Sequence, residues 1–142
     1  MRLFKLTVEL SARPDIVFAA LTEGRSIKAW SGQKGKVQLT IGGVFEMFDG
    51  WVKGRVLLFK PGKILSYSWH TSDWPEKTPD SIVKYTLTKS TKGTKVLLEH
   101  KRFPNIKDME SHKSGWMEHV FEPLEAYLQR RYRKPVKKAL AK

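Results

Sequence analysis

Apolar and polar residues alternate along the first ten positions of the chain. Phe4, Leu6, Val8 and Leu10 are separated by charged or polar residues. A period of two is typical of a strand with one face buried and the other in water. We therefore predict a strand over Leu3–Leu10.

Two short helices are expected next. Ser11 is a plausible N-cap residue, and Pro14 fits the first helical turn, which needs no backbone donor. The apolar run 16–21 would form the first helix, and Gly24 would interrupt it. Residues 26–30 can add one more helical turn before the chain turns again.

The segment between Lys36 and Phe103 is a series of alternating runs divided by turn residues. Asp49-Gly50 is a strong signal for a two-residue hairpin loop. Regular spacing with hairpin turns predicts an antiparallel meander. The six strands expected in it cover residues 36–40, 44–48, 51–60, 64–70, 81–89 and 94–102.

The apolar period then changes from two to that of a helix. The stripe is formed by Met117, Val120, Phe121, Leu124 and Leu128. This spacing predicts a long amphipathic helix over about 109–131 whose apolar side faces the sheet. Pro123 lies inside it and would cost about 3 kcal/mol in a straight helix, so we expect a kink near 118–119.

These elements predict an α+β fold of order β-α-α-β6-α, in which a curved antiparallel sheet of about seven strands wraps around a long C-terminal helix. The ordered set of motifs resembles the START-like, or Bet v-like, helix-grip superfamily. Within it, the chain is similar to the family of the C-terminal domain of the heat-shock-protein-90 ATPase activator. The matching motifs are Val17-Phe18-Ala19-Ala20-Leu21-Thr22, Gly42-Gly43-Val44-Phe45, Pro61-Gly62-Lys63-Ile64, Asp73-Trp74-Pro75-Glu76, Tyr85-Thr86-Leu87-Thr88 and Phe121-Glu122-Pro123-Leu124.

The resemblance implies two kinds of function. Members of this broad family include carriers of lipids or small apolar ligands, and cochaperones. We expect residues 1–132 to form one helix-grip domain that binds a hydrophobic or amphipathic molecule between sheet and helix. The alternative is a protein-interaction module or cochaperone. Residues 133–142 form a basic tail outside the family pattern.

Composition excludes several kinds of chemistry. The chain of 142 residues has no cysteine, so it has neither a disulfide framework nor a thiolate site. No apolar stretch is long enough to span a membrane, and we expect a cytoplasmic protein. No nucleophile elbow, phosphate loop or paired carboxylates are present, so we expect no enzyme and no cofactor. His112 and His119 are seven residues apart, too far for a helical metal pair.

The large side chains on the inward faces are the candidate ligand contacts. We expect Tyr67, Tyr85 and His100 to fix the polar end of a ligand, although packing and hydrogen bonding alone would also explain them. The full set of expected cavity residues is Trp30, Phe45, Met47, Tyr67, Trp69, Tyr85, His100, Trp116, Val120 and Leu124.

The net charge of +13 comes largely from the C-terminal end. A basic field attracts acidic proteins and polyanions without choosing among them. No nucleic-acid-binding motif accompanies it, so we do not expect a nucleic acid. The resemblance to the activator family implies a chaperone, or another acidic protein, as a partner of this basic surface. The expected contact residues are Arg130, Arg131, Arg133, Lys134, Lys137 and Lys138.

Overall fold

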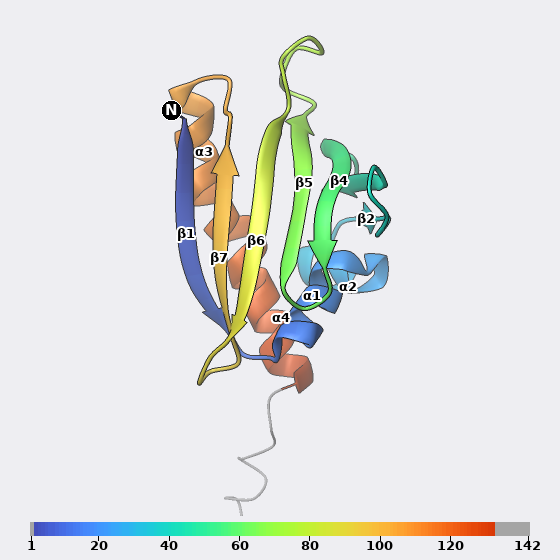
Figure 1. The fold of residues 1–142 in the computed structure, drawn as a ribbon, viewed down its shortest axis with the longest axis vertical. Helices are drawn as coiled ribbons and strands as arrows, with labels where there is room; N and C mark the ends of the chain where they lie inside the picture. Colours follow the sequence, from blue (N-terminus) through green and yellow to red (C-terminus); the bar gives the residue numbers. More distant parts are fainter. Residues whose placement is uncertain (1, 133–142) are drawn as a thin grey trace, which may run out of the picture.

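The computed structural model of the protein describes residues 2–132, and its elements follow the predicted order. Figure 1 shows a curved sheet with all of the helices on one side. The strands are β1 (Leu3–Leu10), β2 (Lys36–Val37), β3 (Val44–Met47), β4 (Val52–Lys60), β5 (Ile64–Thr71), β6 (Ser81–Lys89) and β7 (Thr94–Lys101). The helices are α1 (Pro14–Thr22), α2 (Gly24–Ser31), α3 (Ile106–Trp116) and α4 (Glu122–Tyr132), with a π-helical turn at Met117–Phe121.

The seven strands form one antiparallel sheet in the order β1-β7-β6-β5-β4-β3-β2. The α+β helix-grip prediction is thereby confirmed. Strands β1 and β6 have the predicted bounds, but β2 is two residues long where we expected five. The strand is short because the turn that follows it moves away from β3 and bonds to β4 instead. The amide of Gly42 donates to Val56 O, and the amide of Val56 donates to Gly43 O.

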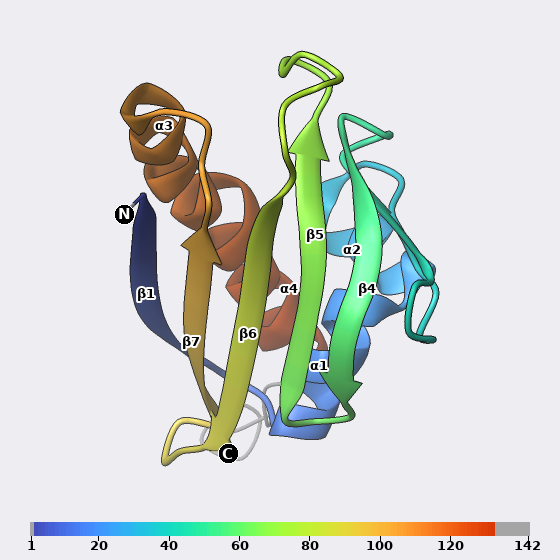
Figure 2. The same cartoon turned by 45° about the horizontal axis from the view of Figure 1, so that its top comes forward.

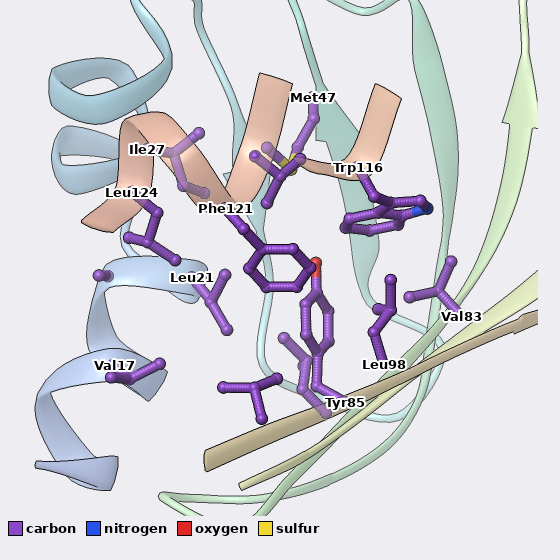
Figure 3. Packing of buried hydrophobic residues seen from close by; sticks show 14 of the residues in the cluster. Val17, Leu21, Ile27, Met47, Val83, Tyr85, Leu98, Trp116, Phe121 and Leu124 are labelled. Atoms are coloured by element: carbon purple, nitrogen blue, oxygen red, sulfur yellow. The ribbon is translucent and has the colours of Figure 1, made fainter. Parts of the chain in front are cut away.

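The C-terminal helical segment crosses the concave face of the sheet, as predicted. In Figure 2 it runs behind the sheet from α3 to α4. Val120, Phe121 and Leu124 are at most 2% exposed. Figure 3 shows Phe121 with Leu21 on one side and Trp116 on the other, close to the ring of Tyr85. The apolar stripe of this segment therefore closes the core.

The C-terminal segment is interrupted where we predicted a kink. The π-helical turn Met117–Phe121 separates α3 from α4, and the amide of Glu122 bonds to Met117 O, five residues back. Pro123 has no amide hydrogen, and its ring excludes the carbonyl of His119 from regular helical geometry. The wider turn accommodates the proline without ending the segment.

Two local predictions are corrected. Ser11 is not the N-cap of α1, because Arg13 holds that position. Instead, the amide and hydroxyl of Ser11 both donate to the Glu125 carboxylate, at 2.8 and 2.5 Å. Lys92 lies 3.4 Å from the same carboxylate. Ser11 thus joins the end of β1 to α4.

The β3–β4 connection also differs from the prediction. Met47 pairs with Val52, so the loop contains four residues and not two. Phe48 and Asp49 both have positive φ, at 56° and 57°. The Lys34 amide donates to Asp49 Oδ1 at 2.8 Å, and the Asp49 amide donates to Lys34 O at 3.0 Å. These two bonds hold a conformation that a bulky residue such as Phe48 rarely adopts.

Candidate functional site

A cavity of about 620 Å³ opens at the end of the sheet where three connections meet. Because the strands alternate in direction, the β3–β4 loop, the β5–β6 loop and the start of α3 all lie at the same end. Figure 2 shows α3 and the β5–β6 loop at the same end of the sheet. The cavity is lined by Gln33, Phe48, Trp51, Trp69, Thr71, Asp73, Trp74, Asp108, Ser111, His112, Ser114, Gly115, Trp116, Glu118, His119 and Val120.

Aromatic rings form much of the cavity wall around His112. The ring centroid of His112 lies 6.1 Å from Trp51, 5.8 Å from Trp69 and 5.8 Å from Trp74. Trp69 and Trp116 lie 5.2 Å apart. A strand, two loops and α3 therefore bring four indole rings to one cavity.

Hydrogen bonds fix the orientation and protonation of His112. Trp69 Nε1–H donates to His112 Nε2 at 3.0 Å. An indole nitrogen is only a donor, so Nε2 carries no proton and His112 Nδ1–H donates to Asp108 O at 2.9 Å. Burial lowers the pKa of His112 from its ordinary value, although the nearby Asp108 and Asp73 act in the opposite direction. His112 is consequently held as the neutral tautomer.

His100 is locked in the same way beneath the cavity. Trp116 Nε1–H donates to His100 Nδ1 at 3.0 Å, so His100 Nε2–H donates to Ser81 Oγ at 2.8 Å. The Ser81 hydroxyl in turn donates to Trp69 O at 2.9 Å. Burial, followed by the effect of neighbouring His112, holds the pKa of His100 well below its ordinary value. Two histidines and two tryptophans therefore form a connected and uncharged network.

Thr71 differs from these hydrogen-bonded residues. Its side chain lines the cavity, yet the residue is only 1% exposed. Within residues 2–132, Thr71 Oγ1 is a buried side-chain oxygen for which no hydrogen-bond partner is present. Such a group costs about 1–3 kcal/mol unless something bonds to it. Because this oxygen is buried just behind the cavity wall, a ligand bonds to it when a neighbouring side chain moves aside.

The structure separates the predicted cavity residues into two groups. Trp69, Trp116 and Val120 line the cavity. The other seven predicted residues, all within the described part of the chain, are outside its lining and belong to the buried interior: Trp30, Phe45, Met47, Tyr67, Tyr85, His100 and Leu124.

The polar atoms of these seven buried residues bond to other protein atoms. The Tyr67 and Tyr85 hydroxyls lie 2.6 Å apart and bond to each other. Burial raises the pKa of both tyrosines. Trp30 Nε1–H donates to Ala20 O at 2.9 Å, and Phe45 stacks on Tyr67 with ring centroids 3.6 Å apart. These contacts are those of a packed core, which was the alternative for each residue.

The basic contact residues are only partly described. Arg130 and Arg131 are exposed at the end of α4. The Arg131 guanidinium lies 5.9 Å from the ring centroid of Tyr132. The other four predicted residues, Arg133, Lys134, Lys137 and Lys138, lie outside the described residues, as does the whole predicted tail 133–142.

Sequence reasoning missed Trp51, Thr71, Asp73 and Trp74, and it assigned His112 no place in the cavity. A signal was present for two of them: Trp51 and Trp74 flank turn sequences rather than strand centres. Both turns follow odd-numbered strands of the meander and so lie at one end of it. Two large aromatic residues at the same end of a sheet indicate an aromatic wall at that end.

The comparisons with known proteins decide the family. The model of the family "Activator of Hsp90 ATPase homolog 1-like protein" matches residues 11–129. The chain belongs to this family. It is 25% identical over 109 residues to the mouse activator of 90 kDa heat shock protein ATPase homolog 1. The match covers 77% of this chain but only 32% of that relative, so the chain spans about a third of the relative's length.

Solved structures support the same assignment to the activator-like family. A Mesorhizobium loti protein is 29% identical with a TM-score of 0.79, and the match covers 92% of this chain and 98% of that one. An HSP90 activator from Plasmodium falciparum is 27% identical, also with a TM-score of 0.79, covering 90% of this chain and 96% of that one. In this activator-like chain, none of the helices within residues 2–132 is long and apolar enough to cross a membrane.

Proposed function

We propose that this activator-like domain binds a small amphipathic molecule in the cavity at the end of the sheet, and that it does so without a chemical step. The observation that carries the proposal is Thr71 at the cavity wall, whose hydroxyl is buried and has no partner among the described residues. A ligand that bonds to this hydroxyl and packs on the apolar lining would give the oxygen a partner and bury apolar area.

The dimensions of the cavity support this function. Its volume of about 620 Å³ is within the range of about 300–1,000 Å³ that small-molecule sites occupy. Trp69, Thr71 and Trp116 are buried and come from the sheet and the long helical segment. The inner wall is therefore built on regular secondary structure and not on loops.

The buried histidine of the cavity, the group best placed for general base catalysis, is already engaged. Both ring nitrogens of His112 have partners, Trp69 and the Asp108 carbonyl. One carboxylate oxygen of Asp73 accepts from Trp51 Nε1 at 3.0 Å. A general base needs a free lone pair within reach of the substrate. His112 has none in this arrangement, which favours binding over reaction.

Substituting Thr71 with valine tests the proposal. Valine has nearly the same shape but no hydroxyl, so we expect unchanged or slightly higher stability because the buried unpaired oxygen is removed. Affinity for a cavity ligand that carries a hydroxyl or carbonyl should fall about 5- to 30-fold. Binding is measured by tryptophan fluorescence with a panel of aromatic alcohols, ketones and lysolipids.

The matched control is Thr86→Val, on the neighbouring strand β6 and outside the cavity lining. This variant should bind like the wild type. If no ligand of the panel binds to the wild type, or if Thr71→Val and Thr86→Val bind equally, the cavity is not the binding site that we propose.

A chaperone partner is the second candidate function. The supporting observation is the Plasmodium falciparum HSP90 activator, which this chain matches over 96% of that protein's structure. We expect the purified protein to raise the ATPase rate of Hsp90, and the effect to weaken with added salt because the chain carries a net charge of +13. The chain without residues 133–142 should stimulate less. An unchanged ATPase rate with the full chain would exclude this function.

A further inference from the structure

The charge of the cavity lining is opposite to that of the protein. The chain contains 27 lysines and arginines against 14 acidic residues. The lining contains three acidic residues, Asp73, Asp108 and Glu118, and no lysine or arginine. A basic protein therefore presents an acidic opening, which repels anions and concentrates cations.

The carboxylates of Asp73 and Asp108 have partners that leave their charge uncompensated. Asp73 accepts from the Trp51 indole, and Asp108 accepts from the Asn105 side-chain amide at 3.0 Å. Both partners are neutral. Within residues 2–132, neither carboxylate has a basic nitrogen within the 4.0 Å of an ion pair. His112, the nearest titratable ring, is held neutral by Trp69.

An indole face at the cavity wall attracts positive charge. The N–H groups of Trp51, Trp69 and Trp116 are engaged by Asp73, His112 and His100. Trp69, Trp74 and Trp116 are at most 7% exposed, whereas Trp51 is half-buried, so Trp51 is the indole whose electron-rich face is open to the cavity. Such a face binds ammonium groups, and neighbouring carboxylates strengthen the attraction.

We propose that the cavity accepts an organic cation: a quaternary ammonium or protonated amine attached to an apolar body that carries a hydrogen-bonding group. The cationic end lies between the face of Trp51 and the acidic residues, and the polar group of the body bonds to Thr71 Oγ1. This inference rests on the proposed function, since it names the chemical class of the ligand for the same cavity.

Three ligands of nearly equal shape separate charge from size. They are 4-(trimethylammonio)benzyl alcohol, its neutral isostere 4-tert-butylbenzyl alcohol, and the anion 4-(hydroxymethyl)benzenesulfonate. All three carry the same hydroxyl for Thr71. We expect the cation to bind about 10-fold more tightly than the neutral isostere, and the anion more weakly than both, by tryptophan fluorescence and titration calorimetry at pH 7.

Neutralising the acidic residues tests the origin of this preference. Asp73→Asn keeps an oxygen for Trp51, and Glu118→Gln changes an exposed residue of the π-helical turn. Together they should reduce the affinity for the cation about 5- to 10-fold and change that for the neutral isostere less than about 2-fold. The control is Glu110→Gln, on α3 and outside the lining, which should leave both affinities unchanged.

The outcomes separate the two proposals. If the neutral isostere binds as tightly as the cation, the charge preference is wrong, whereas the binding cavity stands. If the double variant keeps the full preference for the cation, the acidic residues are not its source and the inference fails. If none of the three ligands binds, and the panel for Thr71 gives no binding either, both proposals fail together.

Discussion

Replacing Trp116 with alanine is expected to lower the free energy of unfolding by about 4 kcal/mol. The side chain is only 3% exposed and packs between Trp69, Tyr85 and Phe121, with ring centroids 5.2–5.9 Å away. Its removal creates a cavity and also leaves Nδ1 of His100 buried without its donor. Urea unfolding followed by circular dichroism measures the loss.

Two further variants divide the loss at Trp116 into its causes. Trp116→Phe keeps most of the volume but removes the N–H group, so it should cost about 1–3 kcal/mol. Trp51→Ala removes an indole that is half-buried at the cavity wall, and it should cost less than Trp116→Ala. A cost for Trp116→Ala no greater than that for Trp51→Ala would show that the network beneath the cavity contributes little to stability.

The fold could be predicted because its elements have strong periods. Strand β1 shows strict alternation with Phe4 and Leu10 buried, and its bounds are as expected. The C-terminal stripe with Val120 and Leu124 has the period of a helix over several turns. Both patterns arise because one face of the element is buried, and the spacing of the apolar residues shows which face that is. Family resemblance added the order in which these elements pack.

Local geometry was harder to predict, because the deciding partners are distant in sequence. Ser11 has the composition of an N-cap, but Glu125 on α4 engages it. Asp49-Gly50 has the composition of a two-residue turn, yet bonds to Lys34 favour a four-residue loop with Phe48 at positive φ. In both cases a tertiary hydrogen bond replaces the local one that the sequence favours.

The candidate site was predicted only in part, for a related reason. Inward strand parity identifies Tyr67 and Tyr85, but it cannot show whether an inward residue packs or lines space. The hydroxyls of these two residues bond to each other, so the interior has no unpaired polar group there. The cavity instead forms where loops and α3 meet, and loop residues such as Trp74 have no periodicity that places them.

The second large effect that we expect is a loss of stability in mild acid, through His100. This residue is buried and neutral in the folded state, with a pKa well below the ordinary value of 6.5. In the unfolded chain the same imidazole takes up a proton near its ordinary pKa. Below about pH 6.5 the unfolded state therefore binds more protons than the folded state, and stability falls as the pH falls.

The magnitude follows from this linkage. One such histidine contributes about 1.4 kcal/mol per pH unit below its unfolded pKa, so His100 should account for about 2 kcal/mol between pH 7 and pH 5. His112 acts in the same direction, because its pKa is also lowered. The lowered pKa of Glu125 affects stability only at more acidic values, below the ordinary carboxylate range. Urea unfolding at pH 7, 6 and 5 measures the slope.

The substitution His100→Gln isolates the contribution of this one ring. Glutamine retains an oxygen acceptor and an amide donor for Trp116 and Ser81 but does not titrate. We expect the variant to be less stable than the wild type at pH 7, since the fit of the planar ring is lost, and to lose about 1.4 kcal/mol less per pH unit on acidification. Equal slopes for the two proteins would mean that His100 is protonated in the folded state. That result would contradict the hydrogen bond from Trp116 Nε1–H to His100 Nδ1, because a protonated Nδ1 cannot accept it.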